Sequence, residues 1–254
     1  MRIAYGPDAS QFGELYLPPD TDQAVPVVVV LHGGYWHAQY GLELGAPLAA
    51  DLVAHGVAAW NIEYRRIENG GGWPTTFDDV AVATDALAGP VQDAAQGRLD
   101  LARVRLLGHS AGGQLAVWLA GRHTLPAGTP GANPRVQVQR VIAQAGVLDL
   151  LAAEQDGLGD GSTALLMGAP SNADRQRYLL ASPQQRLPIG VPVTCVHGTA
   201  DTNVPPSQSA DYVRAAQAAG DRATLVSVAG ADHFALIDPS TPAWADCRDA
   251  LLAP

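Results

Sequence analysis

The chain has 254 residues, of which 47% are hydrophobic and 16% are charged, and this composition excludes a disordered protein. Its 25 acidic and 15 basic residues give a formal net charge of −10 at pH 7, which argues against nucleic acid and anionic membranes as partners. The longest apolar run, Val27–Leu31, is too short to cross a bilayer, and Met1–Ser10 lacks the apolar segment of a signal peptide.

The first part of the chain alternates β-branched runs with helix-patterned segments. Arg2–Tyr5 and Gly13–Leu17 predict an edge hairpin joined through Gly6-Pro7-Asp8. Pro26–Leu31 is continuously apolar, which predicts a strand that is buried on both faces. A further strand is predicted at Val57–Tyr64.

The next predicted helix starts near Thr75, which we expect to be its N-cap. Asp78 and Asp79 then lie in the first turn, where the helix dipole favours negative charge. A strand follows at Val104–Leu107, and the helix after it ends near Gly121. The apolar face of that helix is formed by Ala111, Leu115, Trp118 and Leu119.

The last part of the chain continues the alternation. Strands are predicted at Val138–Ala145, Val193–Val196 and Thr224–Val228. One helix is expected after Pro205-Pro206, and the closing helix is expected to begin at Thr241-Pro242.

This order of elements predicts an α/β fold with a mostly parallel, doubly wound sheet and helices on both of its faces. No linker divides the chain, so residues 1–254 are expected to form a single domain. The stretch 150–190 is rich in Gly, Ala and Asp, and it is a candidate short lid insert.

The segment Gly108-His109-Ser110-Ala111-Gly112 directly follows a predicted strand and opens a helix. This context is typical of a nucleophile elbow, in which a serine is held in a strained conformation and small neighbours let strand and helix approach closely. The helix N-terminus also favours negative charge at the reacting centre. We therefore predict Ser110 as a nucleophile and interpret His109 as a turn residue.

A serine hydroxyl needs a neighbouring imidazole to take its proton, and that imidazole needs an orienting carboxylate. Asp201 lies in a turn after the strand ending at Val196, and His233 lies on the loop after the last strand. The chain order Ser, Asp, His is the one expected for such a sheet. Asp149 also follows a strand and is kept as the alternative acid.

The remaining histidines have other expected roles. His32 and His197 each precede a glycine at a strand end, and they are expected to hold their loops by hydrogen bonds. The others are expected on the surface or in loops: His37, His55 and His123.

Acyl transfer develops negative charge on a carbonyl oxygen, so hydrogen-bond donors must be fixed in place for it. His32-Gly33-Gly34-Tyr35-Trp36 follows the buried strand and supplies main-chain N–H groups there. We predict an oxyanion hole formed by Gly34, Tyr35 and Ala111. The aromatic residues predicted to line the substrate pocket are Tyr35, Trp36 and Trp73, whereas those predicted in the core are Trp60, Trp118 and Trp244.

Together these features resemble the α/β-hydrolase superfamily across nearly the whole chain. Within it the resemblance is to the group of kynurenine formamidases (arylformamidases) and related small bacterial carboxylesterases. The residues that carry it are His32–Trp36, Gly108–Gly113, Tyr5–Asp8, Asn61–Arg65, His197–Asp201 and Asp232–Phe234. The resemblance implies the triad and oxyanion loop described above, and it leaves the acyl group and the leaving group open.

The leading hypothesis is hydrolysis of short-chain carboxylic esters or related acyl groups through an acyl-enzyme on Ser110. The alternative is an arylformamidase that cleaves N-formylkynurenine, and a remote alternative is a non-hydrolytic α/β enzyme such as a lyase. A binding module without activity is disfavoured by the complete Ser, Asp and His set.

No cofactor is expected, because no nucleotide, flavin or zinc pattern occurs in the sequence. The only expected partner is a small-molecule ester or amide substrate, although a homodimer is common at this size. Cys195 and Cys247 fall in a predicted strand and a predicted helix, which favours buried free thiols and a cytoplasmic protein.

Overall fold

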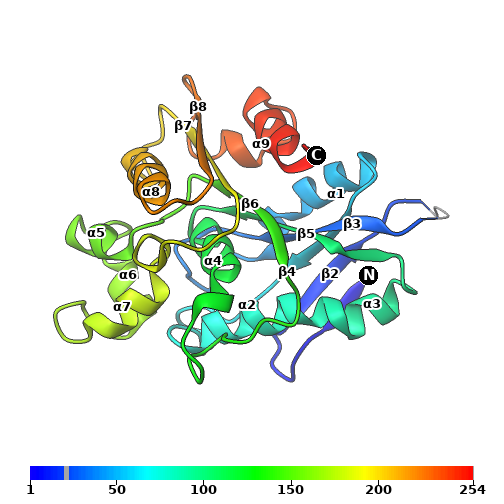
Figure 1. Ribbon diagram of the computed structural model, residues 1–254, viewed down its shortest axis with the longest axis horizontal. Helices are drawn as coiled ribbons and strands as arrows, with labels where there is room; N and C mark the ends of the chain where they lie inside the picture. The colour runs from blue at the N-terminus through cyan, green and yellow to red at the C-terminus, as the bar shows by residue number, and fades with distance from the viewer. Residues whose placement is uncertain (20–22, 254) are drawn as a thin grey trace.

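The computed structural model describes residues 1–19 and 23–253. Among these residues, eight strands form one sheet in the order β1-β2-β4-β3-β5-β6-β7-β8 (Figure 1). Their bounds are β1 Arg2–Ala4, β2 Phe12–Tyr16, β3 Val25–Leu31, β4 Ala58–Ile62, β5 Leu99–His109, β6 Val138–Gln144, β7 Val193–Gly198 and β8 Ala223–Val228. The pairs from β4 to β8 are parallel, whereas β1 and β2 are antiparallel additions at one edge. The predicted edge hairpin and the predicted mostly parallel sheet are confirmed.

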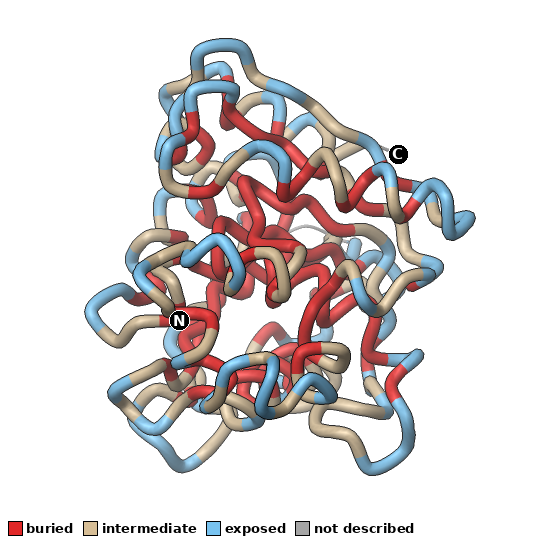
Figure 2. The backbone as a smooth tube through the Cα atoms, turned by 90° about the vertical axis from the view of Figure 1, so that its left-hand side faces the viewer, coloured by how far each residue is buried: buried red, intermediate tan, exposed pale blue. Residues whose placement is uncertain are grey.

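Strand β3 is buried on both faces, as its continuous apolar sequence predicted. Val27, Val29 and Leu31 contribute to one hydrophobic core, and Val28 and Val30 contribute to the other. Successive side chains of a strand point to opposite faces, so one run of apolar residues supplies two cores. The buried backbone accordingly runs through the middle of the molecule, with exposed backbone around it (Figure 2).

Helices cover both faces of the sheet. Helices α1 (Ala46–Ala54) and α9 (Pro242–Leu252) pack on the core that contains Val28. The core that contains Val29 is covered by α2 (Thr75–Asp85), α3 (Pro90–Ala94), α4 (Ala111–Ala120) and α8 (Ser207–Ala218). Short 3-10 turns lie at Leu42–Leu44, Ala86–Ala88, Arg122–Thr124, Pro183–Arg186 and Ala235–Ile237.

The start of α2 differs from the prediction. Thr75 is the first helical residue and not the N-cap, a position that Pro74 occupies. The neighbouring Thr76 hydroxyl donates to the Arg65 carbonyl at 2.6 Å. Asp79 is buried and accepts three hydrogen bonds from Arg65, so its carboxylate serves an ion pair in addition to lying in the first turns of the helix. At the other end of the chain, α9 begins at Pro242 as predicted, and Thr241 is its N-cap.

Residues 149–190, all of them described, hold three short helices: α5 (Leu150–Gln155), α6 (Ser162–Met167) and α7 (Arg175–Ala181). Figure 1 shows these helices grouped at one side of the molecule, next to α8. No helix in the described ranges is both long and apolar enough to span a bilayer.

Candidate active site

Four strands deliver candidate residues to the carboxyl edge of the sheet. β3 leads into the loop 32–36, β5 ends directly before Ser110, β7 leads to Asp201, and β8 leads to His233. Parallel neighbours end at the same edge, so residues distant in sequence meet there. The fold thus brings the predicted nucleophile, acid and base into one region.

Ser110 sits at the turn between β5 and α4 with φ 55° and ψ −119°, a backbone conformation that costs about 1–3 kcal/mol in a non-glycine residue. The turn is held by the Ser110 N–H, which donates to the Gln144 carbonyl at 2.7 Å. Glycine is required on both sides. A Cβ at Gly108 would lie 2.1 Å from the Gly112 carbonyl oxygen, and a Cβ at Gly112 would lie 2.2 Å from that of Leu31.

The Nδ1 atom of His233 lies 2.7 Å from Oδ2 of Asp201, and both side chains are buried. The other carboxylate oxygen, Oδ1, accepts hydrogen bonds from the N–H groups of Asn203 (2.8 Å) and Val204 (2.9 Å). Burial alone would raise the pKa of Asp201. Hydrogen bonds from His197, His233 and Val204 overcome that effect and hold the pKa far below its ordinary value, so the carboxylate is ionised.

Ser110 and His233 line the same cavity, which has a volume of about 130 Å³. No hydrogen bond between the two side chains occurs among the described residues, and such catalytic contacts often tighten only when substrate binds. The cavity is lined by Gly34, Tyr35, Tyr40, Leu44, His109, Ser110, Asn203, His233, Phe234 and Ile237.

The loop after β3 has an unusual backbone. Gly34, Tyr35 and Trp36 all have positive φ, at 112°, 49° and 59°. Glycine adopts this conformation freely, but Tyr35 and Trp36 need tertiary contacts to hold it. The Tyr35 hydroxyl donates to the Asn203 carbonyl at 2.5 Å, and the Trp36 indole donates to Gln114 Oε1 at 3.2 Å.

The main-chain N–H groups of Gly34 and Tyr35 have no intramolecular acceptor within the described ranges. The N–H of Ala111 belongs to the first turn of α4, where helical amides have no partner within the helix. Gly33 brings the loop against Ser110, because a Cβ there would lie 3.1 Å from Ser110 Cβ. The three predicted oxyanion donors therefore belong to two segments in close contact.

Two of the predicted pocket residues lie elsewhere. Trp36 is 1% exposed and part of the main core, because its indole is drawn inward by Gln114. Trp73 packs edge-on against Phe77 at the border of the same core. Tyr35 does line the cavity, and the predicted core positions of Trp60, Trp118 and Trp244 are confirmed.

Several cavity residues carry little signal in the sequence. Tyr40 and Leu44 follow the loop 32–36, and Phe234 and Ile237 follow His233. Tyr40 and Phe234 are 40% and 59% exposed, so both form the rim of the cavity. The one available signal was the position of Phe234 directly after the predicted base.

His109 is the last residue of β5 and not merely a turn residue. Its ring lies 4.5 Å from the His233 ring, and its Nε2 lies 3.0 Å from the His233 carbonyl oxygen, to which it donates. Burial, reinforced by the neighbouring His233, lowers the pKa of His109 to about 3. The ring is therefore neutral and supports the loop of His233.

The alternative acid, Asp149, is engaged elsewhere. Its Oδ1 caps α5 by accepting from the Leu151 N–H at 3.0 Å, and its Oδ2 accepts from Gln184 at 2.9 Å. His32 and His197 hold loops as predicted: His32 contacts Glu63 at 3.0 Å, and His197 contacts Ser209 at 2.7 Å.

The segment 150–190 contacts the loop 32–36 and the residue that follows it. The Tyr35 ring packs on the main chain of Gly159, where a Cβ would lie 2.5 Å from ring carbon Cδ1. One residue beyond Trp36, His37 lies 2.9 Å from the Ser162 hydroxyl, and its other ring nitrogen lies 2.7 Å from Glu68. The insert is thereby anchored beside the site.

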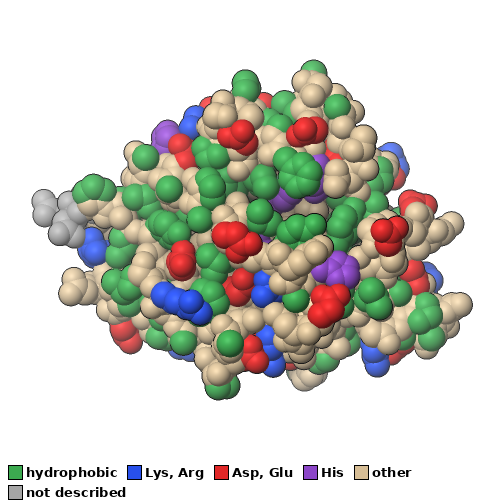
Figure 3. Space-filling model, turned by 180° about the vertical axis from the view of Figure 1, so that it is seen from behind, with side chains coloured by type: hydrophobic (Ala, Val, Ile, Leu, Met, Phe, Trp, Pro, Cys, Tyr) green, Lys and Arg blue, Asp and Glu red, His purple; other side chains and the backbone are tan. Residues whose placement is uncertain are grey.

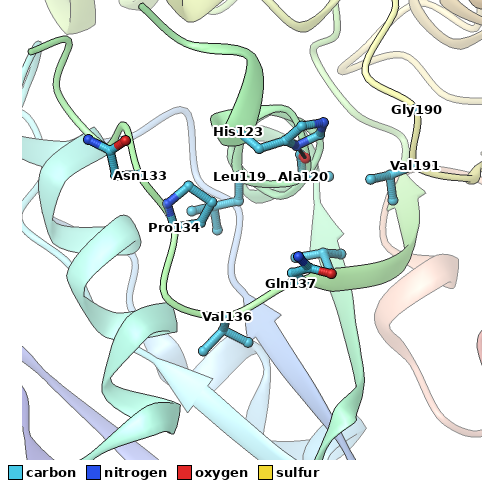
Figure 4. A pocket seen from close by; sticks show the side chains of 10 residues that line it. Leu119, Ala120, His123, Asn133, Pro134, Val136, Gln137, Gly190 and Val191 are labelled. Carbon is cyan, nitrogen blue, oxygen red and sulfur yellow. Dashed lines mark hydrogen bonds between the residues drawn. The ribbon is translucent and has the colours of Figure 1, made fainter. Parts of the chain in front are cut away.

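A larger cavity, of about 520 Å³, lies where α4 ends and β6 begins (Figure 4). It shares no residue with the cavity at Ser110. Among the described residues, no group of His, Cys, Asp and Glu is arranged to hold a metal ion. On the face seen in Figure 3, acidic and basic side chains are interspersed rather than gathered by sign.

The fold and the geometry at the sheet edge define an α/β-hydrolase, which is a hydrolytic enzyme. The chain belongs to the BD-FAE family, whose model matches residues 14–215. A kynurenine formamidase from Salmo salar is 25% identical over 245 residues, which cover 94% of this chain and 76% of that relative. An isoprenylcysteine alpha-carbonyl methylesterase from Arabidopsis thaliana is 26% identical over 245 residues, which cover 91% of this chain and only 55% of the relative.

A solved structure has the same fold. The esterase Est2 of Thermogutta terrifontis with propionate bound superposes with a TM-score of 0.78 and 22% identity, over 100% of this chain and 96% of that chain. Another structure of that esterase is phosphoramylated by tabun, and it superposes with a TM-score of 0.77, 21% identity and the same coverage.

Proposed function

We propose that the chain is a serine hydrolase that cleaves short-chain carboxylic esters through an acyl-enzyme on Ser110. The observation that carries the proposal is the cavity lined by both Ser110 and His233, together with the 2.7 Å contact between His233 and Asp201. In the proposed mechanism His233 takes the proton of the serine hydroxyl as its oxygen attacks the ester carbonyl.

Asp201 accepts from Nδ1 of His233 and so leaves Nε2 free to take the serine proton. The oxygen of the tetrahedral intermediate would receive hydrogen bonds from the N–H groups of Gly34, Tyr35 and Ala111. His233 then returns its proton to the departing alcohol. Water, deprotonated by His233 in turn, hydrolyses the acyl-enzyme and releases the acid.

The lining of the cavity favours a neutral substrate. It holds tyrosines, leucine, isoleucine, phenylalanine and an asparagine, and none of its described residues is Arg, Asp or Glu. A substrate with a free amino group and carboxylate would lose hydration there without gaining an ion pair. The small volume of about 130 Å³ also favours a short acyl group.

Arylformamidase activity is the second candidate, and the similarity to the Salmo salar enzyme favours it. The same residues would attack a formyl group with an aryl amine as leaving group. The test compares kcat/KM for p-nitrophenyl acetate and butyrate with that for N-formylkynurenine. A preference for the esters supports the first proposal, and a strong preference for the formamide replaces it with the second.

The nucleophile is tested separately. The variant Ser110→Ala is expected to lose kcat by at least about 10³-fold, because the triad members act as a unit. A fluorophosphonate should label the wild type at Ser110 and leave the variant unlabelled. Undiminished turnover by Ser110→Ala would exclude this mechanism, and a reaction without any acyl-enzyme would favour a lyase.

We also propose that the insert 150–190 forms one wall beside the site, because it touches Tyr35 and His37. The expected cytoplasmic location, the single domain and the homodimer stay predictions.

A further inference from the structure

A second imidazole contacts the acid of the proposed triad. The Nε2 atom of His197 lies 3.2 Å from Oδ2 of Asp201, which is the same oxygen that accepts from His233. The side chains of His197 and Asp201 are 1% and 0% exposed. Two buried imidazoles therefore share one carboxylate oxygen.

The partners of His197 determine where its proton is. Nε2 faces two oxygens that can only accept, Oδ2 of Asp201 and the Val204 carbonyl at 3.0 Å, so Nε2 must carry the hydrogen. Nδ1 faces the Ser209 hydroxyl at 2.7 Å, and a hydroxyl can donate. The arrangement is satisfied by a ring that accepts from Ser209 at Nδ1 and donates from Nε2 to the Val204 carbonyl, with Oδ2 of Asp201 3.2 Å from the same nitrogen.

The main chain already fixes the position of the acid loop without His197. The Ala200 N–H donates to the Ala231 carbonyl at 3.0 Å, and the Thr199 N–H donates to the Val228 carbonyl at 2.9 Å. These bonds join the loop of Asp201 to the loop of His233. What His197 adds is a ring N–H that is bonded to the Val204 carbonyl and lies 3.2 Å from the carboxylate itself.

We infer that His197 is a positioning residue of the proposed triad, which acts through Asp201. The N–H groups of Asn203 and Val204 donate to Oδ1, and His197, which is bonded to the Val204 carbonyl, places its Nε2–H 3.2 Å from Oδ2, so that the carboxylate is held with Oδ2 directed at His233. Ser209 sets the tautomer of His197 and therefore acts on Asp201 through His197. The inference rests on the proposed role of Asp201 as the acid.

The test compares His197→Gln with His197→Phe. A glutamine places an N–H near the position of Nε2, whereas a phenylalanine fills the space without a donor. We expect His197→Phe to lower kcat about tenfold to a hundredfold, because the lost N–H lies beside a buried charged group. KM should stay within about twofold, because His197 does not line the cavity. His197→Gln should recover most of the lost kcat.

Proton NMR supplies a readout that a merely structural role would not move. The hydrogen between His233 and Asp201 is expected to give a resolved low-field resonance, and that resonance should shift in His197→Phe and return in His197→Gln. Ser209→Ala, a smaller change, should lower kcat in the same direction but less. Thermal unfolding identifies any variant that has failed to fold, and in that case Ser209→Ala carries the test.

The outcomes separate this inference from the proposed function. Asp201→Asn is expected to lower kcat by about 10⁴-fold. If Asp201→Asn retains activity, the triad proposal fails. If Asp201→Asn is inactive and a folded His197→Phe keeps both the wild-type kcat and the low-field resonance, the proposal for His197 is wrong and the triad proposal stands.

Discussion

The Tyr35 hydroxyl donates to the Asn203 carbonyl and so ties the loop 32–36 to the loop that carries Asp201. Burial, with the nearby carboxylates of Asp201 and Asp160, raises the pKa of Tyr35 to about 12, so the hydroxyl keeps its proton. The bond also holds Tyr35 in a left-handed conformation that a tyrosine seldom adopts. The position of the Tyr35 N–H, a proposed oxyanion donor, thus depends on the bond from the Tyr35 hydroxyl to Asn203.

Tyr35→Phe should therefore lower kcat/KM about tenfold, which corresponds to one neutral hydrogen bond. A trifluoromethyl ketone, which forms an oxyanion on the serine, should bind more weakly by a similar factor. Tyr16→Phe is the matched control, because the Tyr16 hydroxyl donates to Glu14 on the edge strand β2. Equal activity of Tyr35→Phe and wild type would contradict the dependence on this bond.

The second anchor of the loop is the contact between Trp36 and Gln114. Gln114 is fully buried, and its amide also donates to the Ala181 carbonyl at 2.9 Å. Gln114→Met keeps the volume but leaves the indole N–H and this carbonyl unpaired, so we expect a loss of about 1–3 kcal/mol in unfolding free energy. Urea unfolding measures it, and an unchanged midpoint would show that the anchor contributes nothing.

A substitution of Gly108 tests how closely β5 and α4 pack at the turn of Ser110. A Cβ at Gly108 would nearly coincide with the Gly112 carbonyl, so Gly108→Ala should destabilise the protein by more than about 3 kcal/mol. Gly89→Ala is the control, because the nearest atom to its Cβ would be 3.9 Å away and its φ is not positive. Similar stability of the two variants would refute the close packing of strand and helix.

The ionisation of Glu63 should make the stability of the fold depend on pH. Burial would raise the pKa of Glu63, but hydrogen bonds from His32 and the Tyr64 N–H, with the Arg66 charge, hold it below 4.5. A depressed pKa means that the ionised carboxylate stabilises the fold above about pH 4.5 and that this contribution is lost as pH falls through the folded-state pKa.

The variant Glu63→Gln should be destabilised by about 1–3 kcal/mol at pH 7, because four donors surround a carboxylate that can only accept. The difference from the wild type should shrink below pH 4.5. Denaturant unfolding at several pH values measures it, with Glu14→Gln as the control. A difference that is constant from pH 7 to acid would rule out ionisation of Glu63 as the source.

Patterns of neighbouring residues in the sequence were sufficient to predict the strands and the turn at Ser110. The continuous run before His32 specified a strand buried on two faces, and the glycines around Ser110 specified a tight turn into a helix. The strand ends then placed Asp201 and His233 at the same edge. These features follow from periodicity and chain order, which a single sequence contains.

The cavity could not be predicted in the same way. Whether a loop tryptophan points outward or inward depends on a partner that is distant in sequence, and Trp36 turns inward because Gln114 accepts its N–H across 78 positions of the chain. Similarly, Tyr40 and Ile237 meet only because two loops converge over Ser110. The contact between His197 and Asp201 could not be predicted either, because the spacing of two residues in the sequence does not give the direction of an imidazole ring.

The close approach of Tyr35 to Gly159 has a consequence for redesign of the enzyme. Grafting a foreign segment in place of 150–190 to alter selectivity would expose the aromatic ring to whatever side chain replaced the hydrogen at position 159, where φ is 63°. A bulkier residue there would push on the loop that carries the proposed oxyanion donors Gly34 and Tyr35. Exchangeable segments should therefore retain glycine at this one contact, or turnover will fall together with the intended change in selectivity.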